Sequence, residues 1–276
     1  MPSLVVQKYG GTSVASLDHM RRVAAIIKNT LAEGVQVVAV VSAMRGAQKE
    51  AGGLSTDELL QLASQGATGS AHWSDQSPAY ASLPRGREVD ALVSLGEMMS
   101  APLMALMLQS EDIPAISFNA YQAGLSLKGD FGSARISGAR MQAIEQALEQ
   151  GLVPVLAGFQ GLNADCEVAT MGRGSSDTTA VALAAALSAD ACLIYTDVAG
   201  VYTADPRVVP DARVIEQISF EEMTEAALMG AKVLDSRALR MAQQYQVPLR
   251  VLSSMEPNQK GTYIYNQESE SGGSKK

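Results

Sequence analysis

The segment LVVQKYGGTSV, residues 4–14, decides the fold. Its apolar start, Leu4–Gln7, predicts a buried strand, and the helical spacing of apolar residues within Met20–Leu31 predicts a helix that begins near Ser16. The paired glycines between them carry no Cβ, so the backbone can approach a phosphate closely. An ordinary strand–turn–helix connection with a surface Lys8 explains the same residues, and this segment alone leaves both interpretations open.

The same alternation of strand and helix continues along the chain. Further apolar strands are predicted at Val35–Val41, Ala115–Phe118, Val153–Ala157, Ala191–Tyr195 and Leu249–Leu252. One long helix is predicted over Arg87–Gln109, with a kink expected at Pro102. Residues 65–86 are rich in Gly, Ser, Ala and Pro and predict a long loop. The pattern favours an α/β fold whose mostly parallel central sheet is sandwiched between helices.

Composition limits the partners and the compartment. The 276-residue chain has a formal net charge of -8 and no block of Lys or Arg, which argues against binding to nucleic acid. Cys166 and Cys192 lack metal-ligand spacing, and two histidines are too few for a His-rich metal site. The sequence shows no signal-peptide pattern and no run of roughly 18 apolar residues, so we expect a cytoplasmic protein without a membrane span.

A second polar segment, MGRGSSDTT over Met171–Thr179, leads into a helix rich in Ala, Leu and Val. Ser175 or Ser176 can cap that helix, and Asp177 suits its positive end. Capping does not explain Arg173 between two glycines, because a cation is unfavourable at a helix N-terminus. Helix amides and a guanidinium together predict a site for a carboxylate or a phosphate.

Two later segments allow a nucleotide-binding and a structural interpretation. The run YTDVAGVYTADPR, Tyr195–Arg207, follows a strand at the end where open α/β sheets bind ligands, but it also fits a plain surface hairpin. In GAKVL, Gly230–Leu234, Lys232 can serve phosphates or lie near the carbonyls that end the preceding helix. The residues alone do not separate these interpretations.

Acidic residues at two other places attract attention. Glu97 is a polar residue in an otherwise apolar helix, and a buried carboxylate of this kind usually has a partner, for which a substrate ammonium is one candidate. Ser55 and Glu58 fit a helix-capping box, which is the simpler explanation for both residues.

Taken together, seven segments resemble the aspartokinases of the amino acid kinase family, and they occur in that family's order. They are KYGGTSV (Lys8–Val14), VSAM (Val41–Met44), LGE (Leu95–Glu97), AGFQG (Ala157–Gly161), GRGSSDTTAVA (Gly172–Ala182), YTDVAGVYTADPR (Tyr195–Arg207) and GAKVL (Gly230–Leu234). The resemblance implies a carbamate kinase-like fold and ATP-dependent phosphorylation of the side-chain carboxylate of L-aspartate. It also implies Mg²⁺ with the ATP, and a homodimer.

The resemblance implies roles for individual residues as well. Lys8 and Asp177 would be catalytic, with Lys8 contacting the transferring phosphoryl group. The aspartate pocket would comprise Thr56, Glu97 at the ammonium, Phe159, Arg173 at the α-carboxylate, and Ser176. The nucleotide and its phosphates would be contacted by Gly10, Gly11, Ser13, Ser42, Thr196, Asp197, Tyr202, Arg207, Lys232 and Val233. No residue is implied as a direct metal ligand.

A single catalytic domain is expected over residues 1–265, with a substrate lobe over about 1–165, a nucleotide lobe over about 166–265 and a disordered tail at 266–276. The family normally continues into regulatory ACT domains, so we expect no feedback inhibition by lysine or threonine. The chain departs from the family's pattern at Arg45–Leu54, an extra stretch before Thr56, and at Asp235-Ser236, where His-Pro is common.

These departures keep two other functions open. The altered loop at Arg45–Leu54 allows a kinase of the same fold that acts on another acid or on a carbamate-like substrate. A non-catalytic nucleotide-binding subunit is the third hypothesis, and the joint presence of Lys8, Arg173 and Asp177 argues against it.

Overall fold

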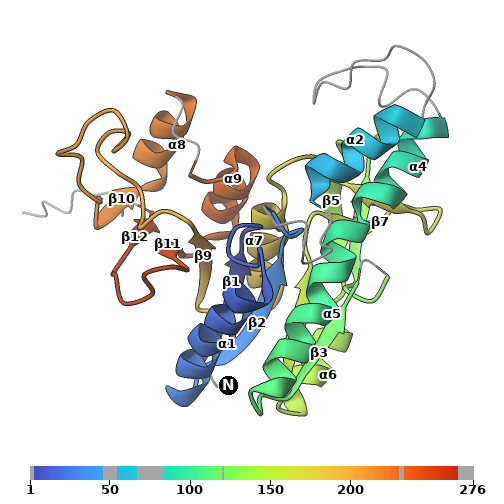
Figure 1. The fold of residues 1–276 in the computed structure, drawn as a ribbon, viewed down its shortest axis with the longest axis horizontal. Coiled ribbons are helices and arrows are strands. Elements are labelled where there is room, and N and C mark those ends of the chain that lie inside the picture. Colours follow the sequence, from blue (N-terminus) through green and yellow to red (C-terminus); the bar gives the residue numbers. More distant parts are fainter. Residues whose placement is uncertain (1–2, 46–54, 67–83, 120, 230–232, 267–276) are drawn as a thin grey trace, which may run out of the picture.

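The computed structural model describes residues 3–45, 55–66, 84–119, 121–229 and 233–266, and the statements below concern these residues. Its centre is an eight-stranded sheet in the order β10-β12-β11-β9-β1-β2-β6-β3 (Figure 1). Neighbouring strands run parallel, except that β11 and β12 are antiparallel. The predicted α/β fold with a mostly parallel sheet is confirmed.

The predicted strands all lie in this sheet: two have the predicted bounds, and the other four differ by one or two residues at one end. In chain order the sheet consists of β1 (Leu4–Tyr9), β2 (Gln36–Val41), β3 (Ala115–Phe118), β6 (Val153–Ala157), β9 (Ala191–Thr196), β10 (Gln217–Ser219), β11 (Leu249–Ser253) and β12 (Thr262–Tyr265). The sequence does not predict β10 and β12, which lie at one edge. These strands are short and mix polar with apolar residues, so they lack a clear period.

Helices cover both faces of the sheet. They are α1 (Leu17–Ala32), α2 (Thr56–Gly66), α4 (Pro84–Val93), α5 (Leu95–Ser110), α6 (Gln142–Glu149), α7 (Ser176–Ala186), α8 (Phe220–Leu228) and α9 (Ser236–Tyr245). The first begins as predicted, because the Ser16 side chain accepts a hydrogen bond from the His19 amide. One aliphatic core lies between the sheet and α1 with α5, and a second lies between the sheet and α6, α7 and α9 (Figure 1).

The alternation of side chains along β1 decides which residues face which helices. Val5 and Tyr9 belong to the core under α1 and α5, whereas Val6 belongs to the core under α7. Since successive strand residues point to opposite faces, Lys8 lies on the α7 side. The strand register thus directs this lysine toward the start of α7.

A second, four-stranded sheet is absent from the sequence-based prediction. In spatial order it consists of β5 (Arg135–Ala139), β4 (Leu125–Lys128), β7 (Gln160–Leu162) and β8 (Val168–Thr170). Strands of this length are too short for periodicity to reveal. Buried Asp90 of α4 accepts hydrogen bonds from the amides of Gly132 (2.9 Å) and Thr170 (2.7 Å), and so ties α4 to this sheet.

The long helix predicted over Arg87–Gln109 is present as α4 and α5, which meet at Ser94 (Figure 1). Pro102 lies inside α5, so the interruption comes at Ser94 and not at the proline. The amides of Ser94 and Met98 still bond the carbonyls four residues earlier, at 3.0 and 3.1 Å. The two helices therefore continue one another.

This helical stretch, Gly86–Ser110, is 25 residues long, and its most apolar 18-residue window has a mean hydropathy of 1.6, enough by length and composition to cross a membrane. Within the protein, 56% of its most apolar window is buried, and α5 packs against α1 and the sheet. A core helix has the same composition, so the stretch is weak evidence for a membrane span.

Two predictions fall mostly outside the described residues. The loop predicted over 65–86 overlaps the end of α2 and the start of α4, so those parts are helical, and the rest lies outside the description. The tail predicted at 266–276 lies outside it as well, apart from Asn266. The division into two lobes stays a prediction.

Candidate active site

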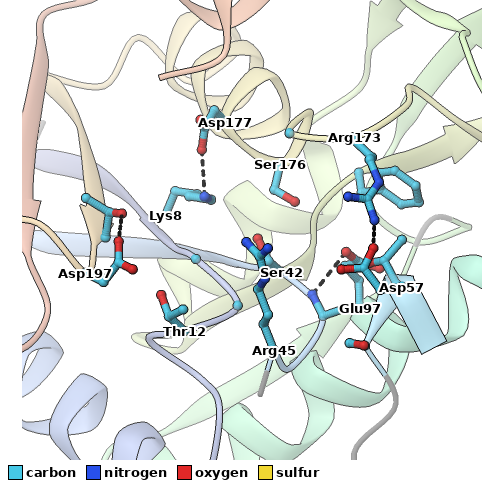
Figure 2. Close-up of a pocket in the computed structure, with 18 residues that line it drawn as sticks. Lys8, Thr12, Ser42, Arg45, Asp57, Glu97, Arg173, Ser176, Asp177 and Asp197 are labelled. Carbon is cyan, nitrogen blue, oxygen red and sulfur yellow. Dashed lines mark hydrogen bonds and ion pairs between the residues drawn. The ribbon is translucent and has the colours of Figure 1, made fainter. Parts of the chain in front are cut away.

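A cavity of about 360 Å³ lies at the carboxyl ends of the central strands (Figure 2). Strand β1 lies between β2 and β9, and the segments that follow these strands line the cavity with Gly10–Thr12, Ser42 and Thr196. The starts of α7 and α2, Phe159 and one side chain of α5 form the other walls. Open α/β sheets bind ligands at this place, where connections from neighbouring strands diverge.

Lys8 and Asp177 form an ion pair in this cavity. Lys8 Nζ lies 2.7 Å from Asp177 Oδ1, because β1 directs the lysine toward the first turn of α7 (Figure 2). The side chains are only 12% and 9% exposed, so each charge depends on the other for compensation. The Asp235 amide donates to the other carboxylate oxygen at 3.3 Å. The two residues implied as catalytic are therefore in contact, while their catalytic role stays a prediction.

The two glycines after β1, Gly10 and Gly11, are needed for different structural reasons. A Cβ at Gly11 would lie 2.5 Å from the Ala43 carbonyl oxygen, so only glycine lets these two segments approach. A Cβ at Gly10 would lie 3.6 Å from Lys8 Nζ and would occupy space beside the amine. The Ser42 amide donates to the Tyr9 carbonyl at 3.1 Å, which holds the end of β2 beside the glycine turn. The turn thus keeps an open space around Lys8.

Glu97 lines the cavity from α5 and is 3% exposed. Its Oε1 accepts a hydrogen bond from the Ala43 amide at 3.0 Å, whereas Oε2 has no hydrogen-bond partner among the described residues. Burial raises the pKa of this carboxyl group to about 8, against the lowering effects of its hydrogen bonds and of Lys8. The expectation of a buried acid is confirmed, and its second oxygen suits a cationic ligand group.

Arg173 forms an ion pair with Asp57 of α2 (Figure 2). Both side chains are about half exposed, and both line the cavity. The sequence predicts a bound anion at Arg173, and in the structure the anion is a side chain of the protein itself. Because exposed ion pairs contribute little, a ligand carboxylate can replace Asp57 at small cost.

The start of α7 differs from the predicted cap. Ser175 has helical backbone angles and its hydroxyl donates to the Gly172 carbonyl at 2.5 Å, so it does not cap the helix. Ser176 is nearly buried and lines the cavity. The positive end of α7 therefore lies at the cavity, with Asp177 in its first turn.

The capping box predicted at Ser55 and Glu58 is confirmed. The Ser55 amide and hydroxyl each donate to Glu58 at 2.8 Å, and the Glu58 amide donates to the Ser55 hydroxyl at 3.2 Å. This cap starts α2 at Thr56, and it leaves Thr56 and Asp57 on the cavity wall.

A second arginine, Arg237 of α9, holds the loop that carries Arg173. Its guanidinium donates to the Arg173 carbonyl at 2.7 Å and to the Met171 carbonyl. It also bonds both oxygens of Asp235, at 3.0 and 2.8 Å. Asp235 in turn caps α9 by accepting from the Arg237 and Ala238 amides. Asp235, at the position where the family commonly has His, thus fixes an arginine against the glycine-rich loop.

Residues 3–253 match the model of the amino acid kinase family. The chain belongs to this family. It is 45% identical over 266 residues to aspartokinase 2 of Bacillus subtilis (strain 168), an alignment that covers 96% of this chain and 60% of the relative. The chain spans about three-fifths of the length of the curated relatives it matches.

Two solved structures of amino acid kinases extend this comparison. Aspartate kinase from Synechocystis has a TM-score of 0.78 and 42% identity, covering 96% of this chain and 40% of that one. Aspartokinase III of E. coli in complex with aspartate and ADP, in the R-state, has a TM-score of 0.75 and 31% identity, covering 97% of this chain and 66% of that one. The likeness therefore extends over nearly all of this chain.

Most of the site residues predicted from the resemblance line the cavity. Those that do are Lys8, Gly10, Gly11, Ser42, Thr56, Glu97, Phe159, Arg173, Ser176, Asp177, Thr196 and Asp197. They lie on strands, on helices and on the segments that connect them, far apart in sequence, and the fold brings them to one place. Their individual roles stay predictions.

Three predicted nucleotide contacts in the described residues lie away from the cavity. Ser13 is 2% exposed, and its hydroxyl hydrogen-bonds the Ser254 hydroxyl at 2.7 Å. Tyr202 forms an antiparallel bridge with Val214 in a surface hairpin, the structural alternative for this segment. Arg207 pairs with Asp205 at 2.8 Å in the same exposed segment.

Val233 lines a second cavity of about 390 Å³ next to the first. The two cavities share Gly174 and Asp177, and the second is also lined by Ala227, Leu234, Asp235 and Ser236. Lys232 lies outside the described residues. The second cavity adjoins the Lys8–Asp177 pair, so it is a candidate place for the rest of a nucleotide.

The cavity also contains residues that the sequence analysis does not assign to it. They are Thr12, Ala43, Arg45, Ser55, Asp57 and Gly174. Asp57 is missed because the capping box already accounts for its neighbours. Arg45 directly follows the VSAM segment at the carboxyl end of β2, and that position is the signal that could have identified it.

Proposed function

We propose that the protein phosphorylates the side-chain carboxylate of L-aspartate with ATP and releases ADP and 4-phospho-L-aspartate. The observation that carries this proposal is one cavity holding Lys8, the buried Glu97 and Arg173. A cation for a phosphoryl group, an anion for an ammonium and a cation for a carboxylate are thereby available together. Relatives named aspartokinase, one solved with aspartate and ADP, support the choice of substrate.

The chemistry needs little from the protein beyond position and charge. The side-chain carboxylate of aspartate is ionised at neutral pH, so it attacks phosphorus without a general base. Its oxygen forms a bond to the γ-phosphorus while the bond to the bridging oxygen breaks, and ADP leaves with that electron pair. Lys8 and the positive end of α7 lower the cost of the negative charge that gathers there.

Aspartate would be held through its two charged α-substituents. The free oxygen of Glu97 would accept from the ammonium, and Arg173 would bind the α-carboxylate in place of Asp57. Thr56, Phe159 and Ser176 would line the pocket between them. The side-chain carboxylate would then be left to meet the phosphoryl group near Lys8.

ATP would lie with its phosphates over the turn formed by Gly10 and Gly11, with Ser42, Thr196 and Asp197 beside them. Further nucleotide contacts are proposed at Ser13, Tyr202, Arg207, Lys232 and Val233. Mg²⁺ typically binds nucleotide phosphates with one or two carboxylates and several waters, and it would neutralise phosphate charge. Asp177 and Asp197 both line the cavity and are suitable donors, so the residues present fit that ion.

Three broader expectations remain part of the proposal. The chain would act as one catalytic domain with a substrate lobe and a nucleotide lobe, in a homodimer. The cytoplasm is the proposed location, because the reaction consumes ATP. The cavity that carries the proposal is lined by residues from both lobes.

The test is ATP turnover with trapping of the acyl phosphate by hydroxylamine. Aspartate is compared with succinate, which lacks the ammonium, with β-alanine, which lacks the α-carboxylate, and with the longer L-glutamate. Hydroxamate from aspartate with little from the other three is expected. Equal turnover of succinate would contradict the role of Glu97. Bound ATP with no hydroxamate from aspartate would contradict the proposed function, and a preference for L-glutamate would indicate a related acid as substrate.

Replacement of Arg237 by alanine is expected to raise the KM for aspartate about tenfold, as loss of a charged hydrogen bond implies. Without Arg237, the loop that carries Arg173 loses hydrogen bonds that hold it, and the position of Arg173 is no longer fixed. The KM for ATP should change less than about twofold, as for a surface substitution. Steady-state kinetics with each substrate varied in turn measures both values.

The matched control is Arg240→Ala, an exposed arginine on the same helix whose side chain, among the described residues, donates to the Ser236 carbonyl of that helix alone. Equal increases in both KM values for Arg237→Ala would show a general loss of structure instead. Partial recovery in Arg237→Lys is expected, because an ammonium can bond one of the two carbonyls.

A further inference from the structure

Arg45 is a cation in the cavity that the proposed reaction has not yet used. It is the last described residue before position 55 and lies four residues beyond the end of β2 at Val41. It lines the same cavity as Lys8 and Glu97, and Figure 2 shows its side chain pointing into that cavity on the side of Ser42.

The backbone at Arg45 is fixed to the glycine turn. Its amide donates to the Gly11 carbonyl at 3.0 Å. A Cβ placed on Gly11 would lie 2.8 Å from the Arg45 Cβ, so the two segments are in close contact. The position from which the Arg45 side chain starts is therefore set by the phosphate-binding turn itself.

The charges in the cavity distinguish Arg45 from the other cations. Lys8 is paired with Asp177, and Arg173 is paired with Asp57. No ion pair of the Arg45 guanidinium occurs within the described residues. A cation that has no counter-ion among these residues in a polar cavity attracts an anionic ligand group.

The surroundings indicate which anion this is. Arg45 lies with Ser42 at the end of β2 and against the Gly10–Gly11 turn, whereas Asp57 and Arg173 lie together at the side of α2. A planar guanidinium with several donors matches the oxygens of a phosphoryl group. These surroundings favour a phosphate over the α-carboxylate as the ligand group at Arg45.

We propose that Arg45 binds the phosphoryl group that is transferred and neutralises its charge during transfer. The inference rests on the proposed function and adds one residue to it. Arg45 stabilises charge and takes no part in bond making. The bond from the acceptor oxygen to phosphorus forms and the bond to the ADP oxygen breaks beside it.

The variants Arg45→Ala and Arg45→Lys test this role, with Arg22→Ala, an exposed arginine of α1 outside the cavity, as the matched control. Arg45→Ala is expected to lower kcat roughly 10²-fold, as loss of one charge-stabilising donor does, with the KM for aspartate nearly unchanged. Added guanidinium should restore part of the kcat of Arg45→Ala only. A kcat within twofold of the unmodified protein would overturn the proposal, as would a loss confined to the KM for aspartate.

A binding measurement keeps the inference separate from the proposed function. Arg45→Ala should lose most of any preference for ATP over ADP in calorimetric titration, since only ATP carries the third phosphate. That result is expected even with a different acceptor acid. If the unmodified protein makes hydroxamate from aspartate and Arg45→Ala keeps both its kcat and its preference for ATP, only the role of Arg45 falls. If no aspartate hydroxamate forms, the proposed function is contradicted. The preference of Arg45→Ala for ATP over ADP then still tests the role of Arg45.

Discussion

Replacement of Lys8 by methionine is expected to lower kcat at least 10²- to 10³-fold, roughly the effect of removing one preorganised donor to a developing charge. The methionine is one atom shorter than lysine and keeps most of the packing of the side chain, but it removes the charge beside the reacting phosphorus. The hydroxamate assay measures the loss, and Lys28→Met, an exposed lysine of α1, is the matched control. Activity within tenfold of the unmodified protein would contradict a catalytic role for Lys8.

The same replacement is expected to lower the free energy of unfolding, and this effect can be separated from the first. Lys8→Met leaves Asp177 buried without its cation, and breaking a buried pair typically costs about 3–5 kcal/mol. The double variant Lys8→Met/Asp177→Asn removes both charges and should recover most of that stability. Denaturant unfolding measures it, and the double variant should remain inactive. Recovered activity would show that the lysine acts only by stabilising the fold.

The central sheet could be predicted because its strands are apolar throughout. Strands such as Val153–Ala157 are covered by helices on both faces, so every position is buried and carries an apolar residue. The second sheet could not be predicted in this way. Its strand Gln160–Leu162 has three residues, and its pairing with Val168–Thr170 depends on the surrounding fold.

The candidate site was predictable where a residue type is unexpected at its position. Glu97 in an apolar helix and Arg173 at a helix start both violate local preferences, and both line the cavity. Asp57 violates none, since an acid is normal in the first turn of a helix. Its pairing with Arg173 joins residues far apart in the chain, which no local pattern contains.

Glu97 links stability and substrate binding to pH. Its pKa is raised by burial from an ordinary 4.5 to about 8, so the folded protein binds this proton more tightly than the unfolded chain does. The contribution of Glu97 to the free energy of unfolding is therefore fully present below pH 4.5, and it is lost as the pH rises from there to about 8. At about 1.4 kcal/mol per pH unit, the loss is on the order of 5 kcal/mol.

Replacement of Glu97 by glutamine is expected to abolish this loss. At pH 9 the variant should be several kcal/mol more stable than the unmodified protein, on the order of the same linkage, and at pH 4 the two should be alike. Denaturant unfolding at a series of pH values measures the difference, with exposed Glu149→Gln of α6 as the control. An equal pH dependence in Glu97→Gln and the unmodified protein would contradict the buried, protonated state.

The same variant, Glu97→Gln, should bind aspartate more weakly than the unmodified protein. An ammonium beside Glu97 favours the carboxylate, so binding of aspartate near pH 7 should release close to one proton from the unmodified protein. Titration calorimetry in buffers of different ionisation enthalpy measures that number, and Glu97→Gln should release none and bind at least tenfold more weakly, as removal of a charged partner implies. Unchanged aspartate affinity in Glu97→Gln would place the ammonium elsewhere. Glu97 destabilises the free protein at high pH, and its proposed binding of the aspartate ammonium explains why this buried position carries a carboxylate.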